Sequence, residues 1–287
     1  MPIAPITANG LPALHLSNAL GEAKVQLHGA HVIHFQPAGQ RPVLWMGSAS
    51  WFAEGKPIRG GVPLCAPWFG PHPTDAALPA HGLVRQRSWR QVRGEELPDG
   101  RTRVELSLTA NAEMLAAWPH PFIASLLVTV GATLELELSI RNTGTAPFLL
   151  GEALHTYFSV SDVRNIAISG LAGATYLDRM DNNARKQQSA APITITAQTD
   201  RLYLSEEPAV VIDDAGFARR ITVRKAGSGG TVVWNPWIEK AKALADFDDN
   251  EWPGMVCIEA ANAADSTVVV PPGFTHHLQQ QIAVEAR

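Results

Sequence analysis

Residues 133–141 read TLELELSIR, a run in which apolar and polar side chains alternate. In an extended chain Leu134, Leu136, Leu138 and Ile140 share one face, and the polar residues between them share the other. Side chains of a strand point alternately to its two faces, so this alternation is typical of a strand buried on one side. The stretch therefore predicts a half-buried antiparallel β-strand.

Similar short runs recur along the chain, separated by Gly, Pro, Asn and Asp. They cover residues 24–36, 103–109, 123–130, 148–158, 193–197, 221–223, 231–234, 268–270 and 276–284. Helical signals are few: residues 112–118, capped by Asn111, and residues 238–244 after Asn235. This pattern predicts an all-β fold, a large antiparallel β-sandwich with a few short helices. No linker interrupts it, so we expect a single domain over residues 1–287.

Composition restricts the function classes. The chain has 287 residues, 46% of them hydrophobic, and a formal net charge of −4. An acidic protein offers no positive field to a polyanion, which argues against nucleic acid or an anionic membrane as partner. No signal-peptide pattern or long apolar segment is present. We expect a monomeric cytoplasmic protein in which Cys65 and Cys257 are reduced packing residues.

Three motifs could suggest other chemistry. His28, His31 and His34 would share a face of a helix, but in a strand His31 points away from the other two, which argues against a metal site. The glycines of residues 227–230 open no helix and therefore indicate a hairpin turn instead of a phosphate-binding loop. The pair His276 and His277 is interpreted as surface histidine. We predict neither a metal nor a cofactor.

Two loops are unusual. Residues 56–71 are rich in Gly and Pro yet contain Trp68, whose ring can offer a flat apolar surface to the C–H face of a sugar. Residues 79–85 follow with His81 and Arg85. The alternative interpretation is that these loops are packed connections whose arginines bind backbone carbonyls.

Two strand residues are candidates for proton transfer. His155 alternates with the apolar residues around it and can face a cleft, although a histidine in such a place is more often simply hydrogen-bonded and half-buried. Glu259 lies in the apolar run 255–262, where burying a carboxylate is costly unless a cation or a ligand hydroxyl compensates. A histidine and a glutamate together form a general acid/base arrangement.

Several blocks resemble the aldose 1-epimerase family, in its glucose-6-phosphate 1-epimerase branch. They occur in family order at residues 58–63 (IRGGVP), 67–71 (PWFGP), 81–85 (HGLVR), 153–158 (ALHTYF), 199–203 (TDRLY), 233–237 (VWNPW) and 257–259 (CIE). The resemblance implies a galactose-mutarotase-like β-sandwich, with His155 and Glu259 as the catalytic pair. It further implies substrate-binding roles for Arg59, Arg85 and Asp200, to which we add His81 and Trp68.

The function expected from this resemblance is interconversion of the α and β anomers of a hexose 6-phosphate, with glucose 6-phosphate as the first candidate. Glu259 would take the proton of the C1 hydroxyl, and protonated His155 would donate to the ring oxygen. Arg59 and Arg85 would bind the phosphate, Arg59 being the firmer candidate, and Asp200 a ring hydroxyl. The alternatives are an epimerase for unphosphorylated aldoses and a carbohydrate-binding β-sandwich without turnover.

Overall fold

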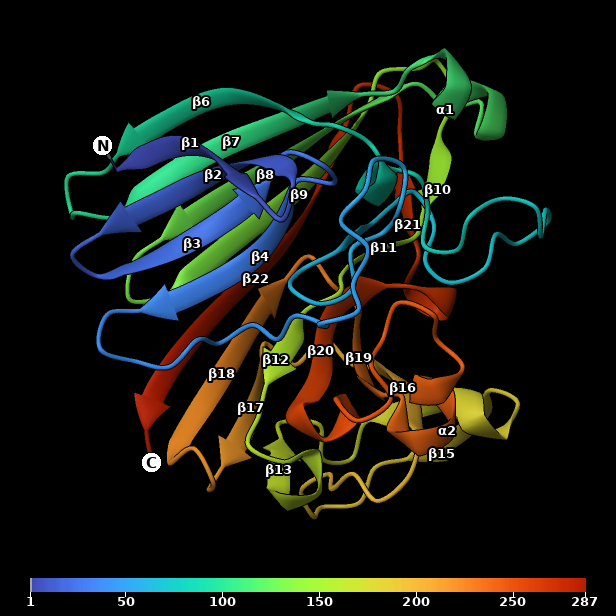
Figure 1. Cartoon of the computed structure of the whole chain (residues 1–287). Helices are drawn as coiled ribbons and strands as arrows, with labels where there is room; N and C mark the ends of the chain where they lie inside the picture. The colour runs from blue at the N-terminus through green and yellow to red at the C-terminus, as the bar shows by residue number, and fades with distance from the viewer. Residues whose placement is uncertain (1) are drawn as a thin grey trace.

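The computed structural model describes residues 2–287, and β-strands dominate it (Figure 1). Every ladder between named strands is antiparallel. One eight-stranded sheet has the order β13 (Ile166–Ser169), β17 (Ala209–Asp214), β18 (Arg219–Ala226), β22 (Thr275–Ala286), β9 (Leu134–Asn142), β8 (Phe122–Val130), β7 (Thr102–Thr109) and β6 (Arg90–Glu96). We call it the long sheet.

A second eight-stranded sheet, which we call the site sheet, carries the candidate catalytic residues. Its order is β15 (Ala184–Gln187), β14 (Thr175–Asp178), β16 (Thr199–Leu204), β19 (Gly230–Asn235), β20 (Met255–Asn262), β11 (Glu152–Leu154) and β5 (Leu64–Cys65), with β12 (Tyr157–Ser159) also paired to β20. Its strands β11 and β20 pack on β22 of the long sheet.

Two smaller sheets complete the architecture. The first comprises β1 (Ile3–Ala8), β2 (Leu11–Asn18), β3 (Gly21–Gln26) and β4 (His31–Pro37), and it covers β7 and β8 (Figure 1). The second pairs β10 (Phe148–Leu150) with β21 (Val268–Val270). The helices are α1 (Ala112–Ala117) and α2 (Trp237–Lys242), with five 3₁₀ turns: η1 (Val84–Gln86), η2 (Val163–Asn165), η3 (Arg179–Asp181), η4 (Trp252–Gly254) and η5 (Ala264–Ser266). Neither α-helix of residues 2–287 has the length that crossing a membrane would require.

Strand β9 confirms the prediction from residues 133–141. It pairs with β8 on one side and β22 on the other. Its four apolar side chains, Leu134, Leu136, Leu138 and Ile140, are all at most 2% exposed. Burial of such a face contributes about 25 cal/mol per Å² of apolar area, which makes the alternation a strong determinant of register. The predicted β-sandwich with few helices is confirmed.

Several expected elements differ in detail. The run 148–158 divides into β10, β11 and β12, while residues 193–197 form no strand and make only an isolated bridge through Ile193. The predicted hairpin at residues 227–230 is wrong, because β18 and β19 belong to different sheets. The glycine-rich segment therefore carries the chain from the long sheet to the site sheet. Asn111 caps α1 as expected, its side chain accepting from the Met114 backbone N–H at 2.9 Å.

The expectation that His276 is a surface histidine is also wrong. His276 on β22 places Nε2 2.9 Å from Oε1 of Glu152 on β11, and Glu152 is fully buried. The side-chain amide of Asn262 on β20 donates to the same carboxylate oxygen at 3.0 Å. Burial alone would lower the pKa of His276, but the hydrogen bond and charge of Glu152 outweigh it and raise this pKa. The three residues form a polar link between the two large sheets.

We expect His276→Ala to lower the free energy of unfolding by about 3 kcal/mol, because it leaves the buried Glu152 carboxylate short of its cationic partner. The stabilisation should be complete below pH 6.5 and should decline as pH rises through the raised pKa of His276. Urea unfolding at several pH values measures both effects. His277→Ala is the matched control, since His277 is exposed and its loss should change stability by about 0.5 kcal/mol or less. Equal losses from the two variants would contradict the link.

Candidate active site

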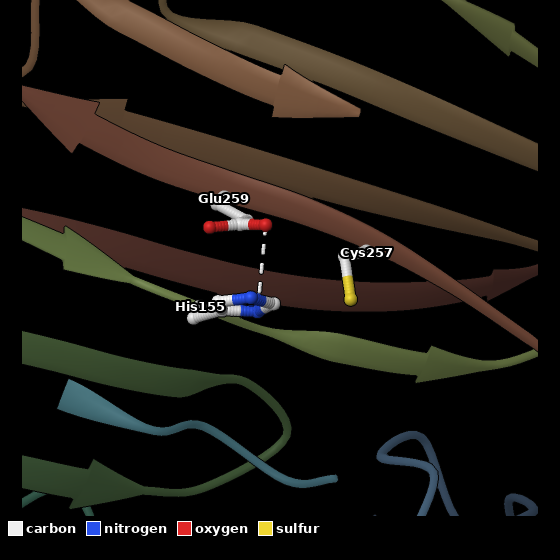
Figure 2. A group of neighbouring side chains, drawn as sticks. All are labelled: His155, Cys257 and Glu259. Atoms are coloured by element: carbon white, nitrogen blue, oxygen red, sulfur yellow. Dashed lines mark ion pairs between the residues drawn. The ribbon is translucent and has the colours of Figure 1, made fainter. Parts of the chain in front are cut away.

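The register of the site sheet brings His155 and Glu259 together. Leu154 at the end of β11 pairs with Ala260 of β20, and Tyr157 at the start of β12 pairs with Cys257. The register is the same on both sides of the break, so His155 lies directly opposite Glu259. Imidazole Nδ1 is 3.4 Å from carboxylate Oε1, and the dashed line in Figure 2 marks this contact.

The break itself is held in place by backbone hydrogen bonds. The His155 N–H donates to the Pro63 carbonyl at 3.0 Å, and the Thr156 carbonyl accepts from the Ile258 N–H at 3.2 Å. His155 therefore leaves the strand ladder while remaining fixed to β20 and to the segment that precedes β5. A side chain held in this way is preorganised for proton transfer.

Both side chains of the pair are deeply buried and incompletely hydrogen-bonded. His155 is 8% exposed and Glu259 is 1% exposed. Their 3.4 Å contact is not aligned as a hydrogen bond, and neither His155 Nδ1 nor Glu259 Oε2 has a hydrogen-bond partner. Because buried polar atoms are almost always satisfied in folded proteins, two such atoms side by side indicate a place where a ligand or a transferred proton belongs.

The protein surroundings favour the neutral forms of both groups. Burial raises the pKa of Glu259 well above its usual value, and the charge of Asp200 adds to this effect. Burial lowers the pKa of His155 well below 6.5, as do the charges of Arg85 and Arg59. The protonated form of His155 expected from the sequence is thus disfavoured by the protein around it. One proton shared by the pair, resting on Glu259, fits these directions.

Aromatic rings surround the histidine. Tyr157 stacks on His155 with ring centroids 4.9 Å apart and planes 9° apart. His81, one of the predicted substrate-binding residues, meets His155 edge-on at 5.6 Å, and Phe69 lies 6.4 Å from it. The histidine is therefore bounded by flat faces that fix its orientation.

Trp68, for which the sequence led us to expect a substrate-binding role, is buried between the two loops. It is only 6% exposed, and its indole N–H donates to the Pro79 carbonyl at 3.0 Å, so it joins the loops 56–71 and 79–85. Its neighbour Phe69 is the ring that approaches His155, with the Arg179 guanidinium 5.1 Å above its centroid. Of these two neighbouring rings Phe69 is therefore the one beside His155, and Trp234 of β19 lies near the same imidazole, with ring centroids 6.1 Å apart.

Arg59 is held firmly by protein groups. Its Nε and Nη2 donate to the two oxygens of Asp246 at 3.2 and 3.0 Å, and its Nη1 donates to the Tyr157 hydroxyl at 3.0 Å. Because Tyr157 stacks on His155, this arginine is joined through one side chain to the candidate acid/base pair.

The histidine run that resembled a metal site supports the Arg59 loop. His28 Nε2 lies 2.7 Å from the Lys56 carbonyl, and His31 Nε2 lies 2.7 Å from the Gly60 carbonyl. His34 instead contacts Glu22 at 3.1 Å. Burial lowers the pKa of His31 to about 3, so it stays neutral and donates to the carbonyl. The three histidines therefore have separate structural partners.

Arg85 is less fully engaged than Arg59. It lies in η1, and its Nη2 donates to the Ala80 carbonyl at 2.9 Å, as the alternative interpretation of this loop anticipated. Its Nε is buried without a hydrogen-bond partner. Beyond the effect of burial, the charges of both arginines lower the pKa of His155. Burial lowers the pKa of Arg85, and the charge of Arg59 lowers it further. The two positive charges therefore lie near the same site.

Asp200 on β16 lies near the same site and has a partner that the sequence analysis missed. Arg179 of η3 donates from Nη1 to Asp200 Oδ1 at 3.2 Å. Burial raises the pKa of Asp200, with Arg179 opposing this shift. In addition to the burial effects described above, the positive charge of Arg179 favours a lower pKa for both Glu259 and His155. It lies in a polar turn, where an arginine usually faces solvent, so no sequence signal distinguishes it.

Cys257 is a second residue that the sequence analysis placed only in the packing. Both cysteines are free and buried, as expected. However, Cys257 and Glu259 share a face of β20, since they are two residues apart in a strand. The donor atoms of His155, Cys257 and Glu259 all lie within 4.8 Å of one another (Figure 2). In residues 2–287 this is the one such group of three metal-binding side chains.

Comparison with known proteins finds one matching family model and several similar proteins that share one name. Residues 12–283 match the family model described as aldose 1-epimerase. A protein of Escherichia coli (strain K12) named "Putative glucose-6-phosphate 1-epimerase" is 35% identical over 266 residues, covering 93% of this chain and 88% of that protein. A protein of the same name from Cenchrus ciliaris is 35% identical, covering 88% and 78%.

The fold has a close counterpart among solved structures. The crystal structure of a protein from Salmonella typhimurium described as a putative mutarotase superimposes with a TM-score of 0.92 at 30% sequence identity. The match covers 99% of this chain and 94% of that chain. The similarity thus includes both large sheets and the loops that carry the site.

Proposed function

The chain belongs to the aldose 1-epimerase family, and from this premise we propose that it interconverts the α and β anomers of a hexose 6-phosphate, glucose 6-phosphate being the first candidate. The observation that carries the proposal is the buried pair His155 and Glu259, with donor and acceptor atoms 3.4 Å apart. A phosphorylated substrate and two free buried cysteines suit a cytoplasmic enzyme.

Anomer exchange needs two coupled proton transfers. A base takes the proton of the C1 hydroxyl, the bond between C1 and the ring oxygen breaks, and an acid protonates that oxygen. The open aldehyde then rotates about C1–C2, and the same transfers run in reverse to close the other anomer. Each well-placed acid or base is worth about 10²–10⁴ in rate, so a pair can supply the catalysis.

The proton balance of the pair suits this cycle. In the proposed cycle the proton that rests on Glu259 first passes to His155 when the sugar binds, and in the opening step Glu259 then takes the O1 proton while His155 gives its own to the ring oxygen. The pair therefore ends with a neutral imidazole and a protonated carboxyl. These are the forms that burial favours, so ring opening returns the pair to the protonation state that its surroundings prefer. Reclosure returns the proton to His155, and no net proton is taken from water.

Positive charge near the pair supports an anionic substrate. A phosphate at C6 carries a charge near −2, and guanidinium groups bind its oxygens better than ammonium groups do. Arg85 presents an unpaired buried N–H, whereas Arg59 is largely occupied by Asp246 and Tyr157. We therefore assign the main phosphate contact to Arg85, with Arg59 as its support. Asp200 and His81 remain proposed contacts of the sugar, and Phe69 takes the apolar role first given to Trp68.

The direct test is NMR exchange spectroscopy of α and β glucose 6-phosphate, with free glucose and free galactose measured under the same conditions. We expect the enzyme to accelerate exchange of the phosphate ester far more than exchange of either free sugar. Equal acceleration of all three would favour an epimerase for unphosphorylated aldoses. Binding of the sugar phosphate without acceleration would favour a carbohydrate-binding protein and would refute the proposed activity.

A further inference from the structure

The cluster of His155, Cys257 and Glu259 has a property that anomer exchange does not require. Its three side chains offer one nitrogen, one sulfur and one oxygen, all within 4.8 Å of one another, and Figure 2 shows the thiol beside the facing imidazole and carboxylate. Anomer exchange uses the nitrogen and the oxygen, whereas the thiol has no part in the proton transfers. A thiol in this place adds the ligand type that soft and borderline metal ions prefer.

We propose that this cluster is a zinc-binding inhibitory site, in which Zn²⁺ binds His155 Nδ1, Cys257 Sγ and a Glu259 oxygen and blocks catalysis. The inhibitory half of this inference rests on the proposed function, but binding of the ion does not. No step of the proposed reaction uses a metal ion, so a bound zinc ion would inhibit the enzyme.

Geometry supports three ligands from the protein. With bonds of about 2.0–2.3 Å, tetrahedral zinc separates its ligand atoms by about 3.3–3.8 Å. His155 Nδ1 and Glu259 Oε1 are 3.4 Å apart and already fit. The outer limit for the cluster is 4.8 Å, so the thiol sulfur must approach by about 1.5 Å at most. One rotation about the Cα–Cβ bond of Cys257 moves its sulfur on that scale.

Two ligand atoms are free to accept the ion. His155 Nδ1 and Glu259 Oε2 are buried and have no hydrogen-bond partner, so binding a metal would break no existing hydrogen bond at either atom. The positive charges of Arg59, Arg85 and Arg179 act on this pair and oppose a cation, so the three protein ligands must outweigh that repulsion.

The proton balance of binding makes the expected zinc affinity depend on pH. Binding converts the Cys257 thiol to a thiolate and the protonated Glu259 to a carboxylate, while neutral His155 donates its lone pair. Two protons are therefore released for each zinc ion bound. Affinity should rise with pH, because protons compete with the ion for the thiolate and the carboxylate.

Cobalt and zinc titrations of the intact, chelator-treated protein test the site. We expect one Co²⁺ per chain with the near-ultraviolet absorption of a thiolate–cobalt bond, displaced by Zn²⁺. Cys257→Ala should abolish that absorption and weaken zinc binding by more than about tenfold, since even loss of an outer-shell partner costs 10–100-fold. Cys65→Ala is the matched control, because Cys65 is equally buried but lies outside the cluster.

The activity assay separates the two halves of the inference. Zinc should inhibit anomer exchange in the parent and in Cys65→Ala, a chelator should restore it, and Cys257→Ala should resist inhibition. If Cys257→Ala unfolds, Cys257→Ser takes its place. Retention of the cobalt absorption or of tight zinc binding in the Cys257 variants would overturn the site. A parent enzyme without any epimerase activity would refute the proposed function while the cobalt spectrum still decides on the site.

Discussion

Glu259→Gln will slow anomer exchange by about 10²–10⁴-fold, the usual contribution of one positioned acid or base. The amide keeps the size and shape of the carboxyl, so it leaves the sheet intact while removing the group that moves a proton at O1. NMR exchange rates of the parent and the variant with glucose 6-phosphate measure the loss.

The same variant should be at least as stable as the parent at neutral pH. The pKa of Glu259 is raised in the folded protein, so the folded state holds its proton more tightly than the unfolded chain does. Stability of the parent therefore falls as pH rises from about 4.5 through the raised pKa. Glutamine does not ionise, so the variant does not lose stability in this way as pH rises. Loss of activity with equal or greater stability would separate a catalytic role from a structural one.

Glu239→Gln provides the control for this substitution. Glu239 lies in the first turn of α2 and is exposed, so it undergoes the same chemical change at the surface and outside the buried pair. We expect its exchange rate to equal that of the parent. If Glu259→Gln retained the parental rate as well, the proposed base would have to be another residue.

The fold could be predicted from the sequence where buried and exposed side chains alternate at every second residue. In β9 every second side chain is buried, and the register of the strand depends on that alternation. Residues 227–229 were misjudged for the opposite reason. A glycine-rich turn shows that the chain reverses, but whether the next strand stays in the same sheet depends on packing between distant segments. Here β19 joins β20 of the site sheet, although β18 precedes it in sequence.

The site was predictable only in part. Strand parity and the cost of burying Glu259 indicated two unusual side chains, but their direct opposition depends on a pairing between segments about a hundred residues apart. Nothing in the sequence around Arg179 or Cys257 indicated that either residue lies at the site. A turn arginine and a strand cysteine are ordinary residues until the fold places them beside Asp200 and His155. Burial of Trp68 and approach of Phe69 likewise depend on how two loops pack.

Arg85→Met will lower kcat/KM for glucose 6-phosphate by about 10–100-fold, whereas it will change kcat/KM for free glucose much less. A hydrogen bond to a charged group contributes about 1.5–3 kcal/mol, and each 1.36 kcal/mol is a factor of ten. Methionine keeps much of the apolar stem, so packing around η1 is preserved. The ratio of the two kcat/KM values isolates the phosphate contact.

Arg90→Met is the matched control, since Arg90 is an exposed arginine at the start of β6 and its loss changes the net charge by the same amount. It should leave both kcat/KM values at the parental level. Equal losses on phosphorylated and free sugar in Arg85→Met would remove the phosphate role from this residue.

Arg59→Ala should give a different pattern from Arg85→Met, although the sequence favoured Arg59 for the phosphate. Its removal leaves the Asp246 carboxylate, 5% exposed, without its bidentate partner and releases the Tyr157 hydroxyl. Because Tyr157 stacks on His155, the disturbance reaches the acid/base pair itself. We therefore expect kcat to fall for both sugars with Arg59→Ala. Selectivity for the phosphate should then depend on Arg85, while Arg59 positions the catalytic histidine.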